Sequence, residues 1–281
     1  MNIFVSSVAF KNLSIQEIDQ IAIEQDFSIE FSANFDPSIE LANQFRSLTI
    51  DRLPHNYFPP PETPFVLNLA SQNEAILELS RNHCKQGIEL ASHCRLKYFS
   101  AHAGFCLDPS PESLGEKLLQ PEYINRETNW DTFIDSCLML SEEASKRDVQ
   151  FLFENNVLMQ TNMRTDGVNP LLCVEPWEIL KVFQYVSTES LGFLLDTAHL
   201  KVSAKSLDFD MNEAVKELSH QIGYIHHSDN DGIKDSNEPL TDDYWFLKYM
   251  KGFNSIPHVL EVKNQSIGDI KNQISLLRSS I

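Results

Sequence analysis

The sequence predicts a single-domain α/β protein built as a (β/α)8 TIM barrel. Its 281 residues suit one large barrel, because such barrels commonly exceed about 200 residues. Eight short apolar runs alternate with longer segments of helical period, which is typical of parallel strands covered by helices on both faces. No internal repeat, low-complexity tract or Gly/Ser-rich linker divides residues 1–281, so one domain is expected.

The eight apolar runs are the predicted strands of the barrel. They are Ile3–Val8, Phe27–Ser32, Pro54–Phe58, Tyr98–His102, Phe151–Asn155, Gly192–Asp196, Gly223–His226 and Val259–Val262. The clearest helix begins at Ser14, where Glu17 completes a capping box ahead of an apolar stripe. The last segment carries a similar stripe: Ile267, Ile270, Ile274 and Leu277. Both stripes are interpreted as surfaces that face the core.

Two long segments without helical period follow strands and should lie above the barrel mouth. They span Phe105–Asn125 and Val157–Val174. Loops of this length in a compact domain usually form lids or substrate walls, although a variable surface insertion stays open for each.

Charge and composition exclude several classes of protein. The 40 Asp and Glu outnumber the 22 Lys and Arg, which gives a formal net charge of −18 and disfavours nucleic acid or an anionic membrane as a partner. The sequence has no stretch of 18 or more apolar residues, so no membrane span is expected. The N-terminus lacks the basic region of a signal peptide. The five cysteines, without CxxC or CxxH spacing, favour a reducing cytoplasm over a disulfide framework.

At six of the predicted strands, a short apolar run leads directly to an ionisable residue. These residues are His55, His102, Glu154, Asp196, His226 and Glu261. The carboxyl ends of barrel strands share one face, so these groups should converge on one mouth. A lone acid or histidine there is more often a helix cap or a rim group, but six together would be costly to bury without a counter-charge. A divalent cation resolves this conflict, and the mixed N/O set suits Mn²⁺, Zn²⁺, Co²⁺ or Fe²⁺, or Mg²⁺ with fewer histidines.

The four last strand ends resemble a known family. The order Glu154, Asp196-Thr197-Ala198-His199, His226-His227-Ser228-Asp229 and Glu261 is similar to that of the xylose isomerase-like TIM barrel superfamily, which includes sugar isomerases, ketose 3-epimerases and endonuclease IV. The resemblance covers essentially the whole chain, His55 and His102 included. Adjacent residues of a strand point to opposite faces, so only one of His226 and His227 can enter the mouth.

The resemblance implies a set of roles. Glu154, Asp196, His226 and Glu261 would bind one divalent metal (Mn²⁺, Zn²⁺, Co²⁺ or Mg²⁺), with His226 favoured over His227. Glu154 and Glu261 would also be the acid/base pair, and His199 would contact substrate. The implied activity is a metal-dependent isomerisation or epimerisation of a sugar or sugar derivative, with proton transfer through a metal-stabilised enediolate.

Two other functions stay open at this point. An endonuclease IV-like enzyme acting on apurinic DNA would use His55 and His102 for an additional metal, but the nearest match to its Asp-x-His motif has Asn237 in place of the histidine. A barrel that binds a small molecule without turnover would not need both glutamates. His55, His102 and His199 are therefore candidates for a second metal or for substrate.

The remaining candidates concern substrate binding. They are His199, Asp229, Lys234 and Tyr57. Whether the sugar carries a phosphate is open, because no Gly-rich phosphate loop is present and Lys234 and Arg164 could each be solvated loop cations. Glu30 also ends an apolar run, and it is assigned only to the lining of the mouth. The expected partner is a small sugar or sugar phosphate, and a homo-oligomer stays open.

Overall fold

The computed structural model describes residues 2–113 and 116–281, and it is a single-domain (β/α)8 TIM barrel as predicted. The strands are β1 Ile3–Ser6, β2 Ser28–Phe31, β3 Arg52–Pro54, β4 Tyr98–His102, β5 Gln150–Glu154, β6 Leu191–Asp196, β7 Ile222–His227 and β8 His258–Leu260. All pairings between them are parallel, in the order β3-β2-β1-β8-β7-β6-β5-β4.

The barrel is nearly closed at the seam between β3 and β4. No ladder pairs β3 with β4 in the described residues; a bridge between His55, just after β3, and Ser100 connects them, and the Asn56 backbone amide donates to the Ser100 carbonyl at 2.7 Å. Elsewhere the ladder is continuous, and β1 lies between β2 and β8.

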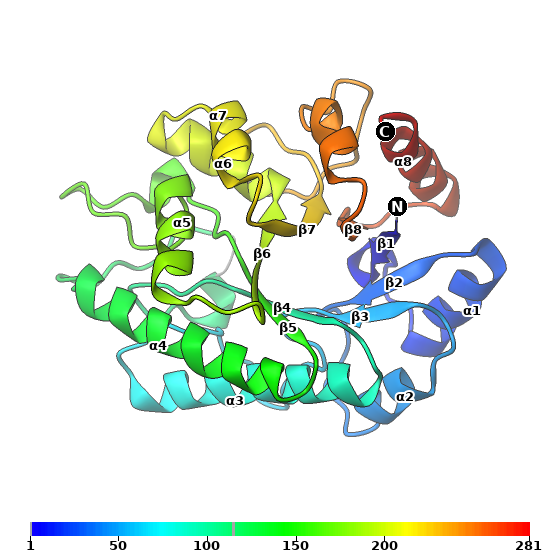
Figure 1. Cartoon of the computed structure of the whole chain (residues 1–281), viewed down its shortest axis with the longest axis horizontal. Coiled ribbons are helices and arrows are strands. Elements are labelled where there is room, and N and C mark those ends of the chain that lie inside the picture. The colour runs from blue at the N-terminus through cyan, green and yellow to red at the C-terminus, as the bar shows by residue number, and fades with distance from the viewer. Residues whose placement is uncertain (1, 114–115) are drawn as a thin grey trace.

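Helices surround the strands on the outside (Figure 1). They are α1 Ile15–Gln25, α2 Leu41–Ser47, α3 Glu74–His93, α4 Arg126–Ser145, α5 Pro176–Tyr185, α6 Thr197–Leu207, α7 Met211–Leu218 and α8 Ile267–Ser279. The capping box at Ser14 and Glu17 is present, and the predicted stripe buries Ile15, Ile18 and Ala22. Within the described residues, no helix is long and apolar enough to cross a membrane.

Several strand boundaries differ from the prediction, and the third strand differs most. It was predicted over Pro54–Phe58, but β3 ends at Pro54. Asn56 has a φ of 48°, in the left-handed region, which turns the chain out of the sheet directly after His55. The first strand also ends earlier, because Ser7–Ala9 form a 3₁₀ turn.

The barrel interior is filled below its carboxyl-terminal mouth. One apolar cluster inside the barrel comprises Phe4, Leu53, Leu152, Leu194, Tyr224 and Val259. A larger cluster fills the space between the sheet and the helices. We call this inner cluster the apolar plug. Side chains nearer the carboxyl ends of the strands therefore pack on top of the plug.

The two long loops lie against each other, and their helical content is limited to 3₁₀ turns at Pro111–Ser113 and Gln160–Asn162 among the residues described. Asn162 links them, because its Oδ1 accepts from the Leu118 amide at 2.9 Å. Arg164 links them again through the carbonyl groups of Pro121 and Glu122, so it is not a free cation at the mouth. Together the loops form one side of the mouth.

Candidate functional site

Glu154, at the end of β5, is the centre of a buried polar cluster at the mouth. Its Oε1 lies 3.4 Å from His199 Nδ1 and 3.9 Å from His226 Nδ1. The same His226 nitrogen lies 3.9 Å from Asp196 Oδ2 and 3.0 Å from Glu261 Oε2. The structure thus brings together the ends of β5, β6, β7 and β8, as the convergence of strand ends requires.

The two adjacent histidines of β7 point in opposite directions. His226 faces the cluster, whereas His227 is buried on the other side of the strand. The imidazole of His227 contacts Tyr244 Oη at 3.0 Å and His258 Nδ1 at 2.8 Å. Both of its nitrogens are therefore occupied, and only His226 has a nitrogen turned toward the mouth.

Local structure holds Asp196 in place at the end of β6. Asp196 caps α6, since its Oδ1 accepts from the His199 amide at 2.7 Å. The Asn155 side chain brackets it, accepting from the Asp196 amide at 2.8 Å and donating to the Asp196 carbonyl at 3.0 Å. Its second carboxylate oxygen, Oδ2, is left facing the cluster.

Unsatisfied buried oxygens indicate that these residues fit a cation. Glu154 Oε2 and Asp196 Oδ2 are buried without a hydrogen-bond partner among the described residues. Ligand atoms of Glu154, Asp196 and His226 lie within 4.8 Å of one another. Unpaired buried carboxylate oxygens are costly, and carboxylate plus imidazole is a donor set for Mn²⁺, Zn²⁺ or Co²⁺. The group could hold a metal.

The electrostatics of the cluster point the same way. Burial raises the pKa of Glu154 well above its ordinary value, and burial raises the pKa of Asp196 to about 6. For His226, burial opposes ionisation, but the carboxylates of Glu30 and Glu261 raise the pKa well above the usual range. Without a metal the cluster therefore holds protons on these residues, and a bound cation would replace them.

His55 and His102 approach Glu154 from the seam side. His55 Nε2 and His102 Nδ1 each lie 3.5 Å from Glu154 Oε2, and the three residues form a second group that could hold a metal. His55 is fixed by a 2.7 Å contact between its Nδ1 and Ser100 Oγ. The structure thus places all six predicted strand-end residues at one mouth.

Glu30, at the end of β2, has closer contacts in the cluster than a lining role requires. It is 1% exposed, and its Oε2 accepts from Tyr224 Oη at 2.6 Å and lies 3.3 Å from His226 Nε2. The sequence identifies Glu30 as the end of an apolar run. Its contact with His226 joins residues 196 positions apart, so no local sequence pattern predicts it.

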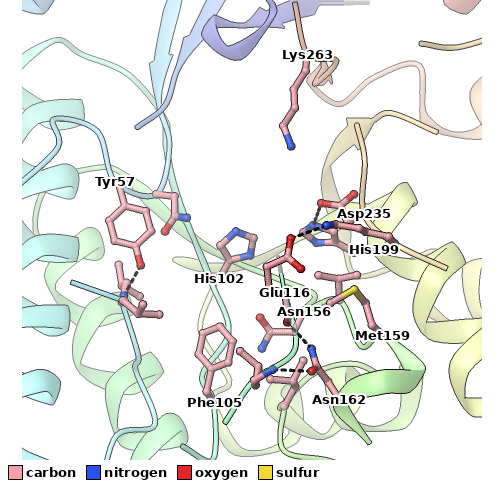
Figure 2. A pocket seen from close by; sticks show the side chains of 17 residues that line it. Tyr57, His102, Phe105, Glu116, Asn156, Met159, Asn162, His199, Asp235 and Lys263 are labelled. Carbon is pink, nitrogen blue, oxygen red and sulfur yellow. Dashed lines mark hydrogen bonds and ion pairs between the residues drawn. The ribbon is translucent and has the colours of Figure 1, made fainter. Parts of the chain in front are cut away.

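A cavity of about 330 Å³ opens above the cluster (Figure 2). His102 and His199 line it on the cluster side, and both lie within 3.5 Å of Glu154. The long loops supply an apolar wall of Phe105, Leu118, Val157, Met159 and Leu171. The size and lining suit a small molecule that is part apolar and part polar.

Six polar residues of the cavity were not predicted: Asn56, Glu116, Asn156, Asn162, Asp235 and Lys263. Asp235 Oδ2 lies 3.4 Å from His199 Nε2, and the side chain of Lys263 reaches into the cavity (Figure 2). Asn56 is 6% exposed, and its Oδ1 has no hydrogen-bond partner among the described residues. Lys263 follows Glu261 by two positions, a spacing that keeps side chains on one face of an extended segment and could have suggested it.

The predicted substrate-binding residues have different surroundings. Tyr57 lines the cavity and its hydroxyl accepts from the Leu67 amide. Lys234 also lines the cavity and pairs with Glu116 at 2.8 Å. Asp229 is not among the residues described as lining the cavity, and its Oδ1 pairs with Lys201 Nζ at 2.6 Å. A substrate role for Asp229 stays a prediction, without support from this geometry.

Comparison with known proteins gives a family and a set of similar folds. The family described as xylose isomerase-like TIM barrel matches residues 19–280. No curated protein sequence matches the chain significantly. A D-tagatose 3-epimerase-like protein shares 20% identity with a TM-score of 0.75, with 100% of this chain and 97% of that chain covered.

Two further solved structures have similar folds and different named activities. A 3-keto-D-glucoside 4-epimerase from E. coli shares 11% identity with a TM-score of 0.68, over 99% of each chain. An AP endonuclease, family 2, from Brucella melitensis shares 13% identity with a TM-score of 0.66, over 99% of this chain and 98% of that one. At these identities the likeness establishes the fold alone.

Proposed function

The chain belongs to the xylose isomerase-like TIM barrel family, and on this premise we propose that it is a metal-dependent isomerase or epimerase of a sugar or sugar derivative. The observation that carries the proposal is that Glu154 and Glu261 both approach Nδ1 of His226, next to a cavity sized for a small molecule that His102 and His199 line. Sugar epimerases among the similar folds support the same reading.

Glu154, Asp196, His226 and Glu261 would hold the divalent ion. When bound, the ion would polarise a carbonyl and an adjacent hydroxyl of the substrate and so acidify the intervening C–H bond. The ion would also balance the charge of three carboxylates that otherwise share a buried space.

Glu154 and Glu261 would move the proton. In the barrel, β6 and β7 lie between β5 and β8, so the two carboxylates approach the cluster from different directions. Two bases on different sides of a carbon can remove a proton from one face and deliver a proton to the other, which inverts the centre. His199, oriented by Asp235, would contact the substrate at the cavity edge.

A direct test combines substrate screening with isotope exchange. Protein loaded with Mn²⁺ should convert one member of a panel of aldoses, ketoses and their phosphates, and chelator should abolish conversion. Run in D₂O, the reaction should place deuterium at the inverted or isomerised carbon. Full retention of the substrate hydrogen would contradict proton transfer and indicate a hydride shift instead.

Asn56 provides a prediction about substrate recognition. Asn56 lines the cavity, and its amide oxygen is buried without a partner among the described residues, so we expect it to accept a hydrogen bond from a substrate hydroxyl. Asn56→Gly removes the amide, and glycine tolerates the φ of 48°. We expect KM to rise about 5-fold, the value of one neutral hydrogen bond, with kcat little changed. Asn12→Gly, at an exposed residue with a φ of 57°, is the matched control.

A second candidate function is a metal-dependent endonuclease acting on apurinic DNA. The group formed by His55, His102 and Glu154 favours it, because it could hold an additional ion. Against it, Asn237 stands where the nuclease motif has a histidine, and its side-chain amide donates to the Glu261 carbonyl at 3.3 Å. The net charge of −18 also opposes DNA binding. Chelator-sensitive nicking of apurinic DNA at low salt, without sugar turnover, would favour the nuclease.

A further inference from the structure

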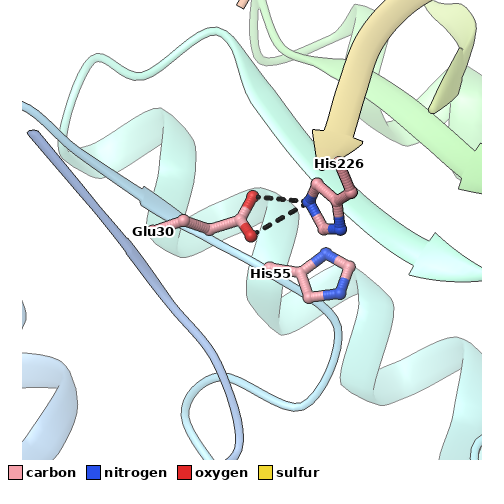
Figure 3. Close-up of side chains that lie close together, drawn as sticks. All are labelled: Glu30, His55 and His226. Atoms are coloured by element: carbon pink, nitrogen blue, oxygen red, sulfur yellow. Dashed lines mark hydrogen bonds and ion pairs between the residues drawn. The ribbon is translucent and has the colours of Figure 1, made fainter. Parts of the chain in front are cut away.

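Both carboxylate oxygens of Glu30 contact one nitrogen of the His226 ring (Figure 3). His226 Nε2 lies 3.0 Å from Glu30 Oε1 and 3.3 Å from Glu30 Oε2. The other ring nitrogen, Nδ1, faces Glu261 at 3.0 Å and Glu154 and Asp196 at 3.9 Å each. The imidazole therefore lies between one carboxylate behind it and three carboxylates in front of it.

Hydrogen-bond chemistry fixes what each nitrogen of His226 can do. An ionised carboxylate only accepts, so Nε2 must carry the hydrogen that it donates to Glu30. By the same rule, Nδ1 donates to Glu261 Oε2 at 3.0 Å while the cluster holds no cation. A cation that displaced this hydrogen would meet the Nδ1 lone pair, because Glu30 keeps the other hydrogen on Nε2. The hydrogen bond to Glu30 thus selects the tautomer that can bind a cation in the cluster.

Glu30 itself is held rigidly from below. Tyr224 is 1% exposed within the apolar plug of the barrel, and its hydroxyl donates to Glu30 Oε2 at 2.6 Å. Tyr224 and His226 lie two residues apart on β7, so both point into the barrel. Glu30 from β2 bridges these two side chains across the interior.

We propose that Glu30 is a positioning residue of the metal site, which orients His226 and keeps its Nδ1 available as a ligand. A carboxylate behind a ligating histidine fixes the ring and raises its basicity, and losing one typically weakens metal binding about 10–100-fold. The inference rests on the proposed function in that His226 must be a ligand.

One competing arrangement uses the same residues. Ligand atoms of Glu30, His55 and His226 lie close enough to hold an ion of their own. That ion would displace the hydrogen from His226 Nε2 and would compete with the hydrogen bond from Tyr224 to Glu30. The two arrangements differ in the number of ions that depend on Glu30.

The experiment is a calorimetric titration of chelator-treated protein with Mn²⁺. Glu30→Gln keeps the size of the side chain and removes its charge, and we expect its Kd for Mn²⁺ to rise about 10–100-fold with unchanged stoichiometry. Tyr224→Phe, which frees the other end of Glu30, should raise Kd by a smaller factor. Tyr98→Phe, whose ring packs 5.8 Å from that of Tyr224, is the control and should bind as wild type does.

The absorption spectrum of bound Co²⁺ adds a readout that a merely structural role would not change. Glu30→Gln should shift the Co²⁺ bands, because the orientation and basicity of one ligand change, whereas Tyr98→Phe should leave them in place. Wild-type affinity and spectrum in Glu30→Gln would overturn the inference and leave the proposed function intact. Loss of one of two ions in that variant would overturn it in favour of a separate site. Wild-type protein that binds no Mn²⁺ would remove the premise and the proposed function with it.

Discussion

Glutamine at Glu154 or at Glu261 is expected to lower kcat by about 10²–10⁴-fold, the range for losing a general acid or base. The amide keeps the size of the side chain and an oxygen for the metal, but it cannot take up a proton at neutral pH. Glu154 ends β5 and Glu261 follows β8, so we expect each carboxylate to serve one face of the substrate. Double substitution should add little to the loss, because the two residues act in one proton transfer sequence.

Hydrogen exchange separates the two roles more sharply than turnover does. If the enzyme is an epimerase with one base on each face, each variant should still exchange the substrate hydrogen of one epimer with D₂O and should fail with the other. Glu238→Gln is the control, because Glu238 lies on the loop after β7 with an exposed side chain that contacts Ser236. Both variants exchanging both epimers at the wild-type rate would show that other groups carry the proton.

Much of this site could be predicted from the sequence because strand ends have a local signal. Glu154, Asp196, His226 and Glu261 each end an apolar run, and the closed geometry of a barrel brings such ends to one mouth without further information. Alternation also predicts that only one of His226 and His227 enters the mouth, whereas the preference for His226 comes from the family resemblance. The fold follows from the same alternation of strands and helices.

What could not be predicted depends on contacts between distant segments. The contact of Glu30 with His226 joins β2 to β7, and that of Asp235 with His199 joins two segments that are far apart in the sequence. The ion pair of Asp229 with Lys201 draws a predicted substrate-binding residue away from the cavity, and no local pattern signals it. The early end of β3 follows from the left-handed backbone at Asn56, which a run of apolar residues does not reveal.

The substitution Asp196→Asn is expected to stabilise the metal-free protein and destabilise the metal-bound one. Burial raises the pKa of Asp196 to about 6, above its value in the unfolded chain, about 4. The folded state therefore binds more protons than the unfolded state between these values, and its stability falls as pH rises through that window. An amide at this position would avoid the loss, which amounts to about 2–3 kcal/mol above pH 6, and asparagine is an equally good helix cap.

Urea unfolding in chelator, repeated from pH 4 to pH 7.5, measures the difference directly. Asp196→Asn should match wild type near pH 4 and exceed it increasingly up to pH 6. With saturating Mn²⁺ the order should reverse, because the ion stabilises only a folded state that binds it tightly. Asp210→Asn is the matched control: Asp210 caps α7 through the Asn212 amide at 2.7 Å, but its side chain is not part of the cluster. A wild type more stable than Asp196→Asn in chelator at pH 7 would mean that the buried carboxylate is balanced without a cation, and the case for a metal in this cluster would fall with it.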